Sequence, residues 1–273
     1  MLEGWQNGCA FRLRAYGRSD SNADACGGET TRYSEPSKLG PQTVKPDGRL
    51  GSSAAHASAN KETSTLRLLF CIKGMNTPDG DAQRVMAEIA SGFVARGHEI
   101  YLLTFDDLEE RSFHGINRGI RRICIGAGED SDSSKSFRIL RQTLIMRRIV
   151  QQVAPDAAIG FLHSAYIPLG LAVWGSGIPL IASEHVAPRH FRVRPLLGAL
   201  LYLTSFLTTK TACCSEQVRQ AFYPFLQRKM IVLPSPIADG NPSLMDKDQL
   251  APVVDSWESL VAAELDNPEL PTG

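Results

Sequence analysis

The sequence of 273 residues has no excess of charge of either sign, because 29 Lys and Arg residues balance 29 Asp and Glu residues. A protein dedicated to nucleic acid would show a strong basic excess, so we expect no nucleic-acid partner. No apolar stretch approaches the roughly 20 residues that cross a bilayer. The first 20 residues have no apolar core of the kind found in secretory signals. These absences favour a globular protein of the cytoplasm.

Metal-binding and disulfide patterns are also missing. No Cys-X-X-Cys pair occurs, and no group of His and Cys residues has the spacing of a zinc site. Scattered cysteines are typical of buried thiols in a reducing compartment. The cysteines therefore indicate neither a disulfide framework nor a zinc site. The six cysteines are Cys9, Cys26, Cys71, Cys124, Cys213 and Cys214.

Composition divides the chain into three parts. Residues 1–64 are rich in small and polar residues without a lasting helix or strand period, which predicts a disordered leader or an upstream extension from a misplaced start codon. Residues 65–240 carry the regular apolar patterns. Residues 241–273 are an acidic tail whose apolar residues have helical spacing, which predicts one amphipathic helix. Those apolar residues are Leu250, Val253, Val254, Trp257, Leu260, Val261 and Leu265.

The central part alternates short apolar runs with helical patterns. Strands are predicted over 66–73, 99–105, 121–126, 156–162, 178–183, 210–214 and 229–233, and helices over 81–96, 134–153, 165–174, 195–207 and 216–223. Such alternation predicts an α/β fold, a three-layer Rossmann-like domain with a parallel sheet. Ligands bind such sheets outside the carboxyl ends of the strands. Loops 74–80, 105–112, 162–165, 184–192 and residue 215 should therefore line one crevice.

The first of these loops carries Asp79, Gly80 and Asp81, with Arg84 one turn into the following helix. A glycine there allows close backbone approach, and the free amides of a helix start attract anions such as phosphate. The side chain of Asp81 could instead cap the helix. The turn lacks the three glycines of a dinucleotide-binding fingerprint, which disfavours a nicotinamide-dependent oxidoreductase.

Polar residues follow two later strands. His163 and Ser164 come directly after one of them, and Glu184 and His185 end the next. A histidine at a strand end beside an acid can hold or polarise a hydroxyl group, so His185 and Glu184 are the candidate catalytic pair. Arg189 opens a basic run that could meet an anionic ligand or a lipid head group. A satisfied structural histidine and a solvated loop remain the alternative interpretations for His163 and Arg189.

The predicted helix over 195–207 is strongly apolar and follows three arginines. This combination is typical of a helix that lies in a membrane interface. A core helix of the sheet protein is the alternative. Peripheral contact with the inner face of the membrane is thus a further expectation.

Several segments resemble glycosyltransferase family 4, in the family's order between residues 66 and 239. Residues 80–90 resemble its Gly-Gly-Ala-Glu-Arg loop and helix, and residues 96–100 its Arg-Gly-His-Glu-Val segment. Residues 155–156 with His163, residues 179–185, residues 215–218 and residues 232–237 are similar to later segments of the family.

The resemblance implies one half of a GT-B fold, in which two Rossmann-like domains face each other across a cleft. It implies transfer of a sugar from a nucleotide sugar with retention of configuration, as in polysaccharide or glycolipid biosynthesis. It also implies that the reaction needs no metal and no other cofactor. His185 corresponds to the family's active-site histidine, and Gly80, with Asp79, to the loop near the donor phosphates. His163, Ser164 and Arg189 are the candidates on the acceptor side, for a carbohydrate or a lipid-linked acceptor.

The sequence also departs from the family. Asp79 or Asp81 stands where the second glycine of the loop is usual, and Gln83 replaces the usual glutamate. Only residues 238–273 follow the last matching segment, too few for a donor-binding domain. We therefore expect an acceptor-binding domain, truncated or in need of a partner that supplies the donor domain, with little or no activity alone. The alternative is a non-catalytic subunit that binds carbohydrate or lipid, or anchors a partner at the membrane.

Overall fold

The structure is a computed structural model, and it describes residues 13–15, 65–76, 80–106, 115–126, 135–185, 202, 206–233, 235 and 247–266. The chain divides into two units, Met1–Gly17 with Thr65–Gly273, and Arg18–Ser64. The second unit lies outside the described residues, so the following concerns the first.

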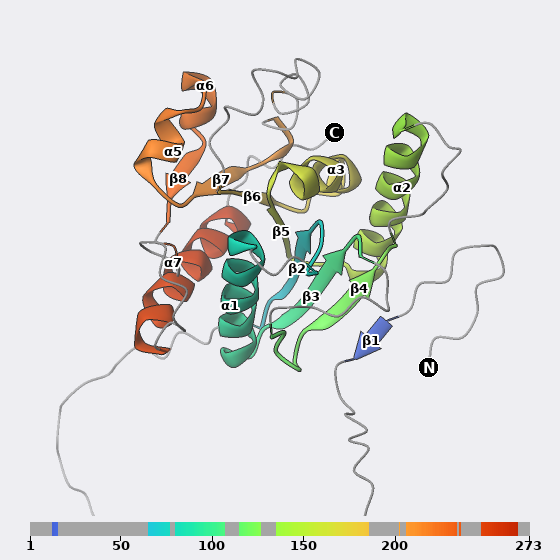
Figure 1. Cartoon of the computed structure of the whole chain (residues 1–273), viewed down its shortest axis with the longest axis horizontal. Coiled ribbons are helices and arrows are strands. Elements are labelled where there is room, and N and C mark those ends of the chain that lie inside the picture. The colour runs from blue at the N-terminus through green and yellow to red at the C-terminus, as the bar shows by residue number, and fades with distance from the viewer. Residues whose placement is uncertain are drawn as a thin grey trace, which may run out of the picture. The chain divides into compact units, whose positions relative to one another are not determined.

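An eight-stranded sheet forms the centre of this unit, with the strand order β1-β4-β3-β2-β5-β6-β7-β8 (Figure 1). Strands β2 to β8 are parallel, and β1 pairs antiparallel with β4 at one edge. The fold class expected from the sequence is thereby confirmed. The strands are β1 (Leu13–Ala15), β2 (Arg67–Ile72), β3 (Glu99–Thr104), β4 (Arg121–Cys124), β5 (Ala157–Phe161), β6 (Leu180–Glu184), β7 (Lys210–Cys213) and β8 (Met230–Val232).

The strand order reverses beside β2. The chain first builds outward from β2 through β3 to β4, then returns to place β5 on the other side of β2 and continues to β8. The connections leaving β2 and β5 therefore diverge at the carboxyl edge of the sheet. This topological switch point is where doubly wound sheets open a crevice for ligands.

Helices α1 (Asp81–Ala95) and α7 (Lys247–Leu265) pack against each other and cover one face of the sheet. Phe70 of β2 lies in the core beneath them, with Phe93 of α1 edge-on to its ring and Phe161 of β5 stacked on it. Trp257 of α7 stacks on Phe161 in turn, with ring centroids 5.9 Å apart. The apolar residues of the acidic tail thus find their partners on α1 and the sheet, far away in sequence.

Helices α2 (Lys135–Val153) and α3 (His163–Val173) cover the opposite face and pack against each other. Two short helices, α5 (Glu216–Gln220) and α6 (Pro224–Gln227), pack beside β7 and β8. Both faces of the central strands are therefore buried, which explains why their sequences are continuous apolar runs rather than alternating ones.

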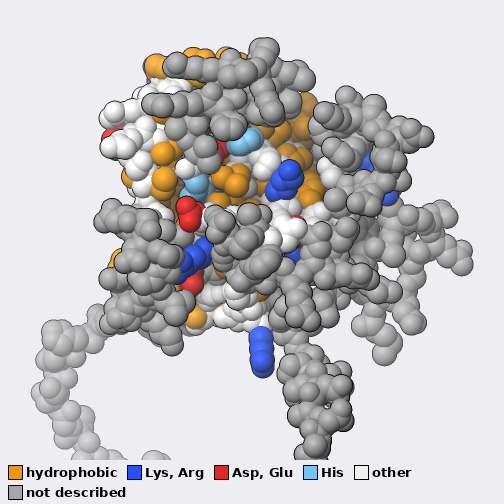
Figure 2. All heavy atoms as spheres, viewed as in Figure 1, with side chains coloured by type: hydrophobic (Ala, Val, Ile, Leu, Met, Phe, Trp, Pro, Cys, Tyr) orange, Lys and Arg blue, Asp and Glu red, His pale blue; other side chains and the backbone are white. Residues whose placement is uncertain are grey.

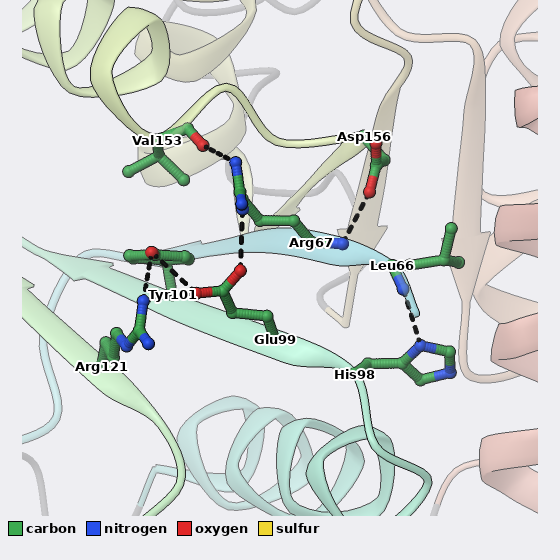
Figure 3. A network of polar contacts seen from close by, with 8 residues as sticks. All are labelled: Leu66, Arg67, His98, Glu99, Tyr101, Arg121, Val153 and Asp156. Carbon is green, nitrogen blue, oxygen red and sulfur yellow. Dashed lines mark hydrogen bonds and ion pairs between the residues drawn. The ribbon is translucent and has the colours of Figure 1, made fainter. Parts of the chain in front are cut away.

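Polar contacts join the strands at the amino edge of the sheet (Figure 3). The Arg67 side chain donates to Glu99 at 2.8 Å and to the carbonyl of Val153 at 3.0 Å. The Asp156 carboxylate accepts from the Arg67 amide at 2.6 Å, and His98 Nδ1 accepts from the Leu66 amide at 3.2 Å. This network lies at the edge opposite the crevice, so its role is to fix strand register.

The structure differs from the sequence expectations in a few elements. Leu13–Ala15 form β1 in a stretch expected to hold no strand, and Pro224–Gln227 form a helix that was not predicted. Helix α3 begins at His163, two residues earlier than expected. Of the predicted helix over 195–207, only residues 202, 206 and 207 are described, and all are helical. The remaining residues of the predicted leader lie outside the described residues.

Candidate functional site at the carboxyl edge of the sheet

The end of β6 sends its polar side chains to opposite faces of the sheet. Ser183 and His185 face the side covered by α1 and α7, and Glu184 faces α3. This follows from the two-residue period of a strand. His185 and Glu184 are therefore adjacent in sequence, but their side chains lie on opposite faces of the sheet. The sequence analysis treated them as one pair and did not predict this separation.

His185 is held between a hydroxyl and an aromatic ring. Its Nε2 lies 3.0 Å from Oγ of Ser183, and its ring stacks on Phe161 at 5.9 Å between centroids. Burial lowers the pKa of His185 below its usual 6.5, and the charges of Glu184 and Asp81 offset this only in part. The imidazole is therefore neutral near pH 7, with one ring nitrogen that can donate a hydrogen bond and one that can accept it.

A small pocket adjoins His185, with a volume of about 10 Å³, enough for one water molecule. It is built from elements that are distant in sequence, because α1, β6, β7, the end of β8 and α7 all contribute. Figure 2 shows histidine side chains (pale blue) beside hydrophobic ones (orange) on the face viewed there. The pocket is lined by Val85, Ser183, His185, Ala212, Cys213, Cys214, Leu233, Ser235 and Trp257.

Glu184 is fully buried and has a partner that the sequence analysis missed. The hydroxyl of Tyr166 donates to its Oε2 at 3.0 Å, and the amide of His185 donates to its Oε1 at 3.1 Å. Nδ1 of His163 lies 3.7 Å from the same Oε2. Burial and the nearby carboxylate raise the pKa of Tyr166 well above its usual value, so the phenol stays protonated and donates. Glu184 therefore links α3 to the end of β6.

The tight turn from β5 into α3 makes this contact possible. A Cβ on Gly160 would lie 2.5 Å from Cβ of Tyr166, so only glycine lets the helix approach the strand so closely. Leu162 joins the two elements with φ at +65°, a conformation that a leucine rarely adopts. Tyr166 lies three residues after His163 and so on the same side of α3. This spacing was the one sequence signal that could have revealed the contact between Tyr166 and Glu184.

The loop before α1 is only partly described, and Asp79 lies outside the described residues. Gly80 is the N-cap of α1 and provides no side-chain hydrogen bond, and Asp81 is the first helical residue. The prediction that Asp81 caps the helix was therefore wrong, because the helix begins one residue too early for its carboxylate to do so. Arg84 is half-buried, and within the described part of the chain its side chain has no ion-pair partner.

A buried ion pair fixes the loop that follows β2. Arg122 of β4 donates to Asp106 Oδ2 at 2.5 Å, and the same oxygen accepts from the Met75 amide at 2.8 Å. Both charged side chains are less than a tenth exposed. The sequence analysis placed residue 106 in a crevice loop but did not identify this anchor, since its partner lies on another strand.

The acceptor-side candidates are not all brought together. Ser164 is exposed in the first turn of α3, next to the half-buried His163, and Arg189 lies outside the described residues. Among the described residues, no three His, Cys, Asp or Glu side chains converge in a way that could hold a metal ion. No helix in the described part of the chain is both long and apolar enough to cross a membrane.

The geometry brings a neutral histidine, a serine hydroxyl and the start of α1 to one edge of the sheet. Val85 of α1 and His185 of β6 line the same pocket, and Asp81 is close enough to His185 to act on its pKa. Such a site can hydrogen-bond the hydroxyl groups of a ligand and can orient an anion near the uncapped amides of α1.

Curated proteins similar to this chain are glycosyltransferases. The "UDP-N-acetylglucosamine--N-acetylmuramyl-(pentapeptide) pyrophosphoryl-undecaprenol N-acetylglucosamine transferase" of Aeromonas hydrophila is 31% identical over 109 residues, 40% of this chain and 25% of that protein. The protein of the same name from Colwellia psychrerythraea is 34% identical over 104 residues, 36% of this chain and 27% of that protein. The match thus spans about a quarter of the length of these relatives.

Solved structures that resemble this chain do so at low sequence identity and with low TM-scores. Acinetobacter baumannii MurG is 17% identical with a TM-score of 0.43, over 67% of this chain and 50% of that one. The UDP-N-acetylglucosamine 2-epimerase of Rickettsia bellii is 12% identical with a TM-score of 0.44, over 72% of this chain and 48% of that one. The model of the family described as Glycosyltransferase Family 4 matches residues 82–238, more than half of the sequence. The chain therefore belongs to glycosyltransferase family 4.

Proposed function

We propose that this chain is the acceptor-binding domain of a retaining glycosyltransferase that takes its sugar from a nucleotide sugar. Family membership supplies the reaction class. The observation that carries the proposal is the meeting of His185 with the start of α1 at one pocket at the carboxyl edge of the sheet. A sugar-transfer site needs this combination, because it must hold a hydroxyl group and lie close to a phosphate.

In this proposal His185 hydrogen-bonds a hydroxyl group at the transfer site. Its neutral state suits that task, because a neutral imidazole can donate and accept a hydrogen bond without the cost of burying a charge. Ser183 holds one ring nitrogen and Phe161 holds the ring plane. Glu184 does not touch the imidazole of His185 but accepts from its backbone amide, so it acts as a positioning residue.

The donor phosphates are proposed to approach the loop of Asp79 and Gly80, with Arg84 as the nearby cation. The donor-binding groups come from a second domain, either on a partner protein or in a longer form of the chain. Catalysis of this type requires donor and acceptor to be held together, so this chain alone is expected to transfer little or no sugar. The reaction is proposed to need no metal.

The acceptor is proposed to be lipid-linked, at the cytoplasmic face of a membrane. The names of both curated relatives include a pyrophosphoryl-undecaprenol acceptor. His163 and Ser164 of α3, and Arg189, are the candidates for acceptor contacts. His163 is the better supported of the two described ones, because it lies beside the buried carboxylate of Glu184.

The test measures the affinity of the purified chain for a water-soluble, short-chain polyprenyl-pyrophosphoryl sugar by calorimetry. We expect the wild-type chain to bind, and His185→Ala to bind at least tenfold more weakly. Arg118→Ala serves as the control, because Arg118 is exposed in the turn before β4. Equal binding by wild type and His185→Ala, with both proteins folded, would contradict the role of His185.

A parallel thermal-shift series with UDP, GDP, ADP, their sugar conjugates and NAD tests whether the donor site lies outside this chain. We expect no shift, because the donor groups lie on the second domain. A shift of several degrees with one nucleotide would correspond to linked binding of roughly a kcal/mol or more. That outcome would place a donor site on this chain and overturn the proposal of an acceptor domain alone.

A further inference from the structure

Helix α7 contributes one side chain to the pocket beside His185. Trp257 lines that pocket and is 3% exposed. The other residues of the pocket come from α1, from the strands β6 and β7, and from the segments that follow β6, β7 and β8. One wall of the candidate site is therefore supplied by a helix that lies far along the chain from the strand end that carries the histidine.

The ring of Phe161 joins Trp257 to His185. Its plane lies 16° from the imidazole plane of His185 and 22° from the indole plane of Trp257, with 5.9 Å between ring centroids in both pairs. The ring of Phe70 also stacks on Phe161, at 6.1 Å and 19°. Three rings thus lie nearly parallel to the fully buried Phe161. Because close-packed rings restrict one another's tilt, the plane of Phe161 determines the plane of His185.

This ring contact supplies a restraint that the hydrogen bond of His185 does not. Nε2 of His185 lies 3.0 Å from Oγ of Ser183. A single hydrogen bond permits the imidazole to rotate about the line that joins these two atoms. The contact with Phe161 removes that rotation. The hydrogen bond and the ring contact together therefore set the direction in which the second ring nitrogen points.

Trp257 is itself held firmly in place by its neighbours on α7. Val254, one turn earlier, packs closely on α1, because a Cβ on Gly92 would lie 2.3 Å from its Cγ2. Glu258, the next residue, pairs with Arg96 and contacts the buried His98 at 3.0 Å. A functional group is oriented precisely only when the residues that support it are locked by their own packing. The indole of Trp257 meets this condition.

We propose that Trp257 is a positioning residue for His185 and acts through the ring of Phe161. This inference rests on the proposed function, in which the imidazole of His185 holds a hydroxyl group at the transfer site. It adds the requirement that α7 be docked on α1 for that imidazole to be oriented. If Trp257 only stabilised the fold, its replacement would lower the melting temperature without changing the surroundings of the imidazole.

Replacing Trp257 changes no charge near His185. The charges that act on the imidazole belong to Glu184 of β6 and Asp81 of α1, whereas α7 adds only the uncharged indole to the pocket. A change in the titration of His185 would therefore report altered hydration or orientation of the ring rather than a lost charge. The titratable groups that β7 and its end bring to the pocket are the thiols of Cys213 and Cys214.

The experiment follows the imidazole of His185 by NMR in the full chain with labelled histidine, and His185→Gln identifies its signals. In wild type, Overhauser contacts should join the ring of Phe161 to both His185 and Trp257. Trp257→Met fills much of the space without a ring. It should move the imidazole signals toward those of an exposed histidine and raise the pKa of His185 toward its usual 6.5. Trp257→Phe keeps a ring and should retain the wild-type signals.

The same variants are measured by calorimetry against the short-chain polyprenyl-pyrophosphoryl sugar. Trp257→Met should weaken binding at least about fivefold, and Trp257→Phe should stay within about twofold of wild type. The matched control is Leu260→Ala, a buried residue one turn further along α7 that does not line the pocket. This control should lower the melting temperature by several degrees but leave the signals of His185 unchanged and binding within about twofold of wild type.

Three results would each overturn the proposal: unchanged His185 signals in Trp257→Met, the same change in Leu260→Ala, or altered signals in Trp257→Phe. If Trp257→Met does not fold, the Overhauser contacts of wild type decide, and the absence of either contact overturns the proposal. If wild type does not bind the polyprenyl-pyrophosphoryl sugar, the proposed function fails, while the NMR comparison still tests whether Trp257 positions His185. Binding by wild type with identical His185 signals in every Trp257 variant would do the reverse.

Discussion

Both helical layers of this domain bury apolar side chains against the sheet, but their solvent-facing sides differ. The layer of α1 and α7 is acidic, and Arg96 at the end of α1 pairs with Asp255 and Glu258 of α7. The layer of α2 and α3 is basic and leaves Leu140, Leu144 and Trp174 exposed. Burial against the sheet therefore explains why both layers form. Among the described residues of these four helices, only the layer of α2 and α3 exposes large apolar side chains.

Polar pairs make α7 part of the domain rather than a loose tail. Arg96, just after α1, bonds Asp255 and Glu258 of α7, and the buried His98 contacts Glu258 at 3.0 Å. Trp257 from the same helix lines the pocket next to His185. A segment that composition sets apart as an acidic tail thus supports the candidate site.

The largest expected effect compares two tryptophans, one in each layer. Trp257 is 3% exposed and Trp174 is 56% exposed. Trp257→Ala should lower the free energy of unfolding by about 3–5 kcal/mol, because it leaves a cavity over Phe161. Trp174→Ala should change it by no more than about 0.5 kcal/mol. Urea denaturation measures both, and similar losses in the two variants would remove the distinction between the layers.

A smaller effect is expected when the link between α1 and α7 is cut. Glu258→Gln removes the charge that Arg96 and the buried His98 share, and should cost about 1–3 kcal/mol of unfolding free energy. Asp255→Asn is the matched control, because that carboxylate is 67% exposed. The control should cost less than about 1 kcal/mol. If Asp255→Asn destabilised the protein as much as Glu258→Gln does, the stabilising contacts would not be confined to the Glu258 carboxylate.

The smallest effect concerns pH and the polar end of β6. The folded-state pKa of His185 lies below that of the unfolded chain, so the unfolded state binds the proton more readily. The contribution of His185 to stability is therefore complete above about pH 6.5 and is lost as the pH falls through the folded-state value. The melting temperature should fall on acidification from about pH 7.5 to about pH 5.5.

His185→Gln should make that fall shallower, because glutamine does not titrate in this range. The comparison uses the difference in slope between the two proteins rather than the melting temperature at one pH, so the lost packing on Phe161 does not affect it. Identical slopes would show that the protonation of His185 is not linked to folding.

Much of the fold could be predicted from sequence. The apolar runs of β2 and β5 and the helical spacing of α1 are local signals. The alternation of strands and helices that defines a parallel α/β sheet can therefore be recognised from the sequence. Helix α7 was also visible in its spacing, but its partner was not. The contact between Trp257 and Phe161 joins residues far apart in the chain, and no local pattern encodes it.

The candidate site was predictable in position but not in arrangement. Topology alone placed His185 and Glu184 at the carboxyl edge, and this is where they lie. Their hydrogen-bond partners could not be predicted from the sequence. Tyr166, for example, reaches Glu184 only because α3 approaches β5 closely at Gly160. The same holds for Arg122 and Asp106, which meet across neighbouring strands.

The sequence by itself determined the fold class, the family and the edge of the sheet at which ligands should bind, since these follow from periodicity and from local motifs. Only the tertiary structure decided which face each polar residue of β6 serves, where α7 packs, and that α2 presents its leucines and arginines together to solvent. The reason is physical. Periodicity fixes which residues of an element share a side, whereas packing against distant elements decides which side is buried and which side chains stay exposed to solvent.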